Sequence, residues 1–145
     1  MLKLLGLKKL SGLLASTLIC SVFVVSGGAA LADDSSEGFA FYLEFLKTAA
    51  AADDLGEIAP LLPSWWRERY ESADEATKAG ALERKSKLAR DLQEVALEKA
   101  EAQDDGLRLH MTAKEQNGFP MRGNVLLVRE SGSFVVEEEI WATSQ

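Results

Sequence analysis

The spacing of apolar residues changes near Gly106, and this change limits the possible folds more than any other feature of the chain. Before Gly106, apolar residues recur every three or four positions, as they do on one face of a helix. After it, apolar and polar residues alternate, which is typical of a strand with one dry face. The alternating apolar positions are Leu107, Leu109, Met111 and Ala113. Helices followed by strands indicate an α+β domain.

The helical half, residues 39–105, divides into three or four helices. The first carries its apolar stripe from Phe39 to Ala50, and a short second helix follows Asp53-Asp54. Ser64 is a candidate N-cap for a third helix. The longest helical pattern runs over 74–103, where Gly80 could divide it, and we expect Gly106 to end it in a left-handed cap.

The remaining residues, 106–145, predict an antiparallel meander of about three strands on which the helices pack. Asn117-Gly118 indicates a hairpin turn whose two central residues both have positive φ. The run 125–128 is apolar at every position, as in a central strand, and Ser131-Gly132-Ser133 marks a second turn.

The first 32 residues have the organisation of a cleavable secretory signal peptide. Three lysines come first, an apolar stretch from 10 to 25 follows, and Ala30-Leu31-Ala32 supplies the small residues that a signal peptidase accepts. We expect cleavage after Ala32, a mobile polar lead-in over 33–38, and a single domain over 39–145. The mature protein would then be periplasmic or secreted.

Two other interpretations of the N-terminus are a permanent anchor and a lipid attached at Cys20. The apolar stretch is about 16 residues long, shorter than the roughly 20 that a spanning helix needs, so no stable membrane span is expected after cleavage. Lipidation requires a small residue before the cysteine, and Ile19 stands there. A paired arginine, which would indicate the twin-arginine route, is missing from this segment.

Removal of the signal peptide changes the chemistry that remains. It takes away the only cysteine, three of the 16 basic residues and none of the 23 acidic residues. The mature domain would therefore carry a net charge of −10 and no thiol for a disulfide, a nucleophile or a metal ligand. Such a charge disfavours nucleic acid as a partner. With a single histidine and no cofactor motif, neither a metal nor a cofactor is expected.

Three local patterns, together with the order of elements, resemble the nuclear-transport-factor-two-like (cystatin-like) superfamily, in particular its small exported bacterial members. The patterns are Phe-Leu-Lys-Thr-Ala-Ala-Ala-Ala-Asp-Asp-Leu (45–55), Leu-Leu-Pro (61–63), and Val-Leu-Leu-Val-Arg-Glu-Ser-Gly-Ser-Phe-Val-Val-Glu-Glu (125–138). The resemblance implies a helical lid over a curved sheet that forms a cone. The family usually pairs more than three strands. This chain is expected to have a long charged helix in place of a further strand, and a missing strand implies a shallower cone. Its isomerase-like enzymes place an aspartate base and a tyrosine inside the cone, but no residue of this chain matches that motif by position.

Two residues are candidates for acid/base chemistry. His110 alternates with Leu109 and Met111, so it is a surface residue, a group lining the cone, or a core histidine. Glu138 falls in register with Val136, which would bury its carboxylate and raise its pKa. An edge strand that frays is the alternative for Glu138.

Trp65, Trp66 and Tyr70, with Arg67 between them, form the densest aromatic cluster of the chain. Aromatic residues on a short helix usually cap a core. Adjacent residues on a helix point about 100° apart, however, so one tryptophan could face solvent and contact a partner. Arg67 could bind a carboxylate.

These observations lead us to expect an exported, non-catalytic domain that binds an unknown envelope protein or a small apolar ligand. A homodimer is compatible with this expectation. The alternative is a small isomerase-like or cyclase-like enzyme with His110 or Glu138 as the acid/base residue inside a sheet-and-helix cone.

Overall fold

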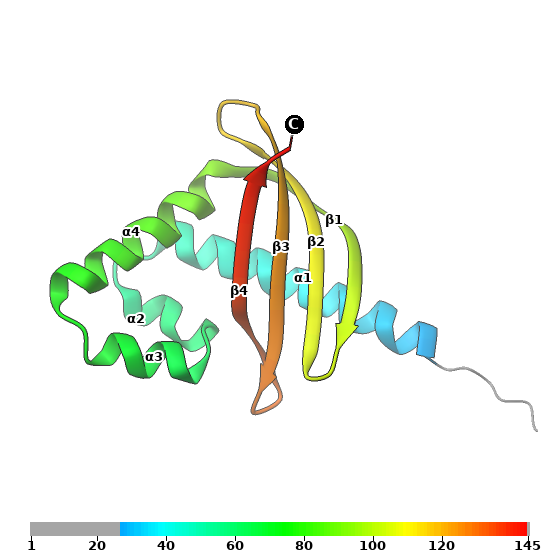
Figure 1. Cartoon of the computed structure of the whole chain (residues 1–145), viewed down its shortest axis with the longest axis horizontal. Coiled ribbons are helices and arrows are strands. Elements are labelled where there is room, and N and C mark those ends of the chain that lie inside the picture. Colours follow the sequence, from blue (N-terminus) through cyan, green and yellow to red (C-terminus); the bar gives the residue numbers. More distant parts are fainter. Residues whose placement is uncertain (1–26, 145) are drawn as a thin grey trace, which may run out of the picture.

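The computed structural model describes residues 27–144, and within them helices precede a four-stranded antiparallel sheet (Figure 1). The elements are α1 (Gly27–Ala51), α2 (Leu55–Ile58), the 3₁₀ helix η1 (Ala59–Leu61), α3 (Ser64–Glu71), α4 (Glu75–Asp91), β1 (Leu92–Gln103), β2 (Gly106–Glu115), β3 (Pro120–Glu130) and β4 (Ser133–Thr143). The strand order β1-β2-β3-β4 is a meander. The predicted α+β class is confirmed, with four strands in place of about three. Most of the predicted signal peptide lies outside the described residues, and no helix in residues 27–144 has the length and apolar character to cross a membrane.

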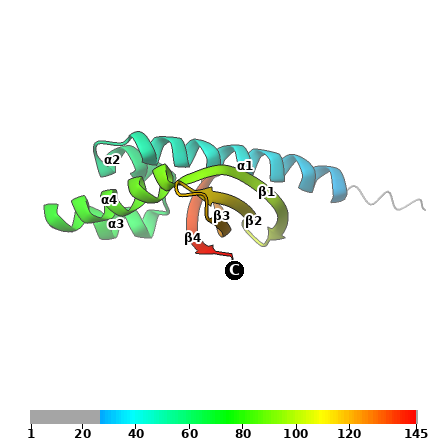
Figure 2. The ribbon, with the colours of Figure 1, turned by 90° about the horizontal axis from the view of Figure 1, so that it is seen from above.

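The core lies between α1 and one face of the sheet (Figure 2). The alternation predicted after Gly106 is confirmed, because every apolar position of that pattern on β2 is buried. Tyr42, Phe45 and Ala49 of α1 pack in the same core cluster as Val125 and Leu127 of β3. Gly80 does not break α4, which buries only small residues: Ala81, Ser86 and Ala89.

The predicted helix over 74–103 is wrong in its second half. α4 ends at Asp91, and the chain continues as β1, which pairs with β2 from Leu92–Glu115 to Gln103–Gly106. The β1–β2 register shifts twice, and Glu94 has a φ of 51°. Bulges of this kind interrupt alternation, so the segment lacks the sequence pattern of a strand.

Gly106 also has a different role from the predicted helix cap. It opens β2, where a Cβ atom would lie 1.9 Å from the backbone oxygen of Leu127. Glycine is therefore needed here because two strands approach closely, and not because of a left-handed conformation.

The segment 33–38, expected as a lead-in before the first helix, instead lies inside α1. Asp34 and Glu37 each lie 3.1 Å from Nη2 of Arg129 on β3. The Arg129 guanidinium also lies over the ring of Phe134, 4.0 Å from its centroid. Ion pairs thus connect this part of α1 to β3 of the sheet.

The two predicted hairpin turns are present, but the prediction for the first turn is wrong in its backbone angles. Between β2 and β3 only Gly118 has positive φ (88°), and Asn117 does not. Between β3 and β4, Ser131 and Gly132 both have positive φ, at 51° and 86°. The turn type predicted for the first hairpin therefore occurs in the second.

Candidate binding cleft

The helices α2, α3 and α4 border a half-open cleft of about 470 Å³. Trp66 and Tyr70 of α3 form its aromatic wall, and Leu55 of α2 and Leu82 of α4 add aliphatic surface. Trp66 and Tyr70 lie one turn apart, as predicted, and their rings stack with centroids 3.9 Å apart and planes at 28°. Both side chains are half-buried. Two of the aromatic residues singled out in the sequence thus line one concave site.

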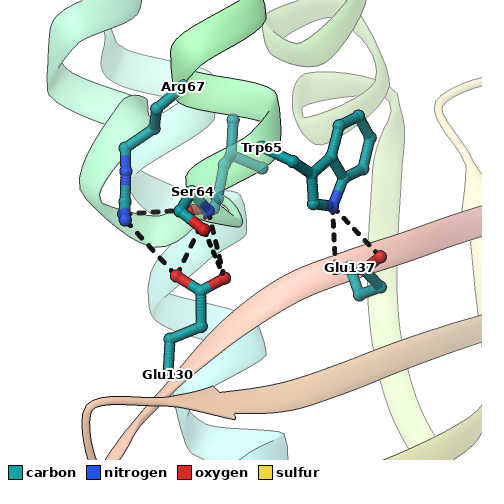
Figure 3. Close-up of polar contacts among 6 residues, drawn as sticks. Ser64, Trp65, Arg67, Glu130 and Glu137 are labelled. Carbon is teal, nitrogen blue, oxygen red and sulfur yellow. Dashed lines mark hydrogen bonds and ion pairs between the residues drawn. The ribbon is translucent and has the colours of Figure 1, made fainter.

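The adjacent Trp65 points away from this cleft. Its side chain is 48% exposed, and its indole Nε1 donates to the Glu137 carboxylate at 3.1 and 3.2 Å (Figure 3). The angular separation of neighbouring residues on a helix explains why one tryptophan lines the cleft and the other does not.

Trp66 packs against the hydrophobic core from its half-buried position, and polar contacts add to this packing in holding α3, since none of its residues is fully buried. Ser64 is its first residue, and the N-cap position belongs to Pro63, which has no side-chain cap. The Glu130 carboxylate serves instead: it accepts from the backbone N–H of Ser64 at 3.0 Å and from Arg67 Nη2 at 3.3 Å (Figure 3). Because the first N–H groups of a helix have no partner within it, Glu130 acts as a cap from the distant β3–β4 hairpin. Sequence reasoning missed Glu130, which lies 66 positions away from Ser64.

Acidic groups outnumber basic groups around the cleft. Four carboxylates and two basic groups line it. Arg67 pairs with Glu130, and its Nη1 also donates to the carbonyl of Leu62 at 3.0 Å. Lys78 pairs with Glu75 at 3.1 Å. The remaining three carboxylates, Asp53, Asp54 and Glu71, have no basic partner among residues 27–144, so the cleft is locally negative.

His110 lies on the sheet face that is turned away from α1. Its neighbours Leu109 and Met111 point into the core, and its Nε2 lies 3.4 Å from Glu101 Oε2 without hydrogen-bond geometry. Lys99, and secondly His110, hold the pKa of the Glu101 carboxyl below its usual range. His110 does not line the α2–α3–α4 cleft.

Of the two interpretations of Glu138, burial is wrong, and β4 is an edge strand of the sheet, as in the alternative. Leu126 pairs with Glu138, but Leu127 pairs with Val136, so Glu137 is an extra residue in β4 and the alternation reverses after it. The Glu138 side chain is 44% exposed and lies 3.4 Å from Arg108 Nη1.

Glu139 takes the buried position, with only 2% of its side chain exposed. Its carboxylate accepts hydrogen bonds from Tyr42 Oη at 2.5 Å and from Lys85 Nζ at 2.8 Å. Trp141 Nε1 donates in turn to Tyr42 Oη at 2.9 Å. Burial, and secondly the Glu139 charge, raise the pKa of Tyr42 far above its ordinary value of 10.0.

This buried network joins α1, α4 and β4. The lining of the α2–α3–α4 cleft, and that of a second concavity beside Gly106 and Arg129, does not include Tyr42, Lys85 or Glu139. A substrate in either concavity would not contact these groups, so we assign the network to the stability of the fold.

Comparison with known proteins found no matching family model, no matching curated protein and no matching solved structure. The resemblance to the nuclear-transport-factor-two-like superfamily therefore gains no support from these comparisons.

Proposed function

We propose that this protein is an exported, non-catalytic binding domain that captures a partner or a small apolar ligand in the cleft between α2, α3 and α4. The observation that carries this proposal is the stacked pair of Trp66 and Tyr70, which forms one wall of that cleft. A volume of about 470 Å³ lies in the range of ligand-binding pockets. Half-buried aromatic side chains are also the groups that most often anchor a bound partner.

The enzyme alternative has less support. It needs an acid/base residue inside the cone, where the core side chains Leu109, Val125 and Leu127 are completely buried. His110 and Glu138 lie outside this packed core. The fourth strand favours the proposed relationship to the nuclear-transport-factor-two-like superfamily, because that family usually pairs more than three strands.

Export through cleavage after Ala32 is part of the same proposal. Residues 33–37 read Asp-Asp-Ser-Ser-Glu, and Asp and Ser are unfavourable inside helices but preferred at helix starts. A mature chain that begins at Asp33 would place these residues at the start of α1. Intact mass measurement of the protein from the envelope fraction tests this step: we expect a mature chain beginning at Asp33, and a full-length mass in the membrane fraction would contradict cleavage.

Binding is tested with N-phenyl-1-naphthylamine, a neutral apolar dye whose fluorescence rises in apolar sites. We expect the exported protein to bind the dye, and the variant Trp66→Ala to lose most of this binding. The matched control is Trp65→Ala, which removes a tryptophan outside the cleft and should bind normally. A second variant, Ala79→Phe, fills the cleft from an exposed position of α4 and removes no core side chain. Normal binding by folded Trp66→Ala and Ala79→Phe proteins would refute the assignment of the site.

A further inference from the structure

We infer that the cleft selects a cationic chain segment, in which an arginine or lysine side chain of a partner protein is flanked by apolar residues. This inference rests on the proposed function and adds the chemical class of the bound partner. Three features of the cleft carry it: its charge, its aromatic wall and its half-open shape.

The charge of the cleft favours a cation. Asp53, Asp54 and Glu71 have no basic partner in the part of the chain that the structure describes, whereas the two basic lining residues are each already paired. Asp54 also accepts a hydrogen bond from the backbone N–H of Gly56 at 2.6 Å, which fixes its carboxylate at the start of α2. The net charge of −7 for the whole chain adds attraction at longer range.

The aromatic wall suits the same ligand. A guanidinium or an ammonium group is attracted to the faces of Trp and Tyr rings, and its aliphatic stem packs on apolar surface. Trp66 and Tyr70 supply the rings, while Leu55 and Leu82 supply the apolar surface. The protein contains such a contact internally, because the guanidinium of Arg129 lies over the ring of Phe134.

The half-open shape favours a chain segment over a free small molecule. Small-molecule sites bury most of the surface of their ligand. The cleft between α2, α3 and α4 remains open to solvent on one side, so it can cover one side of a bound chain and leave the rest exposed. The side chains of such a chain would enter while its backbone continues past the rim.

The test compares three blocked probe peptides by isothermal titration calorimetry with the exported protein: acetyl-Leu-Arg-Leu-Arg-Leu-amide and the versions with Gln or Glu in place of Arg. We expect the Arg peptide to bind at least about tenfold more tightly than the Gln peptide and the Glu peptide not to bind, with an affinity that falls as salt increases. The double variant Asp53→Asn/Glu71→Gln should lose several-fold affinity for the Arg peptide and none for the Gln peptide. The matched control is Glu83→Gln, because Glu83 is an exposed carboxylate of α4 that does not line the cleft.

The outcomes separate this inference from the proposed function. Equal binding of the Arg and Gln peptides would overturn selection for a cation, and the proposed function would stand. If N-phenyl-1-naphthylamine binds but no peptide does, selection for a cationic segment is likewise overturned and the proposed function stands. Agmatine, a free guanidinium compound, binding as tightly as the Arg peptide would overturn the assignment to a chain segment. If neither the dye nor any peptide binds, both proposals fail.

Discussion

Removal of the Tyr42 hydroxyl tests the buried network directly. In Tyr42→Phe, the Glu139 carboxylate loses its 2.5 Å donor and Trp141 Nε1 loses its acceptor. A hydrogen bond to a charged group contributes about 1.5–3 kcal/mol, and the unpaired N–H of the half-buried Trp141 adds to the loss, so we expect the free energy of unfolding to fall by about 2–4 kcal/mol. For a domain of this size, that loss corresponds to a decrease in Tm of roughly 10 °C.

The matched control is Tyr70→Phe, which removes a hydroxyl that has no hydrogen-bond partner in residues 27–144. We expect its free energy of unfolding to stay within about 0.5 kcal/mol of that of the wild type. Urea unfolding followed by circular dichroism measures both variants. Equal stability of the two variants would refute the claim that the Tyr42–Glu139 contact stabilises the fold.

The stability difference between the wild type and Tyr42→Phe should depend on pH in a defined direction. The folded-state pKa of Tyr42 is raised by burial and by Glu139, whereas the unfolded chain has the ordinary value of 10.0. Above that pH the unfolded state loses a proton that the folded state keeps, so the wild type loses stability as pH rises. The stability gap between wild type and Tyr42→Phe should therefore shrink by about 1.4 kcal/mol between about pH 8 and about pH 11. A gap that stays constant or widens would refute the burial of Tyr42 beside a carboxylate.

Three further substitutions test other parts of the fold. Gly106→Ala should lower the free energy of unfolding by about 2–3 kcal/mol in urea titrations, because its methyl group would collide with the β3 backbone, whereas the control Gly80→Ala in α4 should raise it by about 0.5–1 kcal/mol. Ser86→Ala should raise the free energy of unfolding by about 1 kcal/mol, because the hydroxyl of Ser86 is buried and has no hydrogen-bond partner among residues 27–144; a decrease would contradict that assignment. Glu130→Ala should speed amide hydrogen exchange in α3 and leave exchange in the sheet unchanged, and Glu138→Ala should alter neither.

The sequence predicted the elements whose apolar spacing is regular. β2 alternates without interruption, and the α3 aromatic residues lie one turn apart, so both were found from periodicity. β1 was missed because Leu88, Leu92 and Val95 also fit a helical stripe. As an edge strand with two bulges and many charged residues, β1 shows neither alternation nor a continuous apolar run. Its pairing with β2 decides its conformation, and that pairing is a tertiary contact.

The site was predictable only in part, for a similar reason. Trp66 and Tyr70 could be selected as a cluster from their spacing on one helix. The cleft that they line depends on the positions of α2 and α4, and α3 is oriented by Glu130 from a hairpin far along the chain. No periodicity within α3 carries that information.

The bulge at Glu137 shows how one residue can decide which group is buried. Strict alternation from Val136 would have buried Glu138, but the extra residue in β4 gives that position to Glu139. Glu139 can occupy it because Tyr42 and Lys85 stand opposite and satisfy its carboxylate, as a buried charge requires. Without the bulge, Glu138 would face the core. Trp141 would then point to the opposite face of the sheet and lose its hydrogen bond to Tyr42. The buried network therefore requires the bulge, since the register after it places Glu139 and Trp141 beside their partners on α1 and α4.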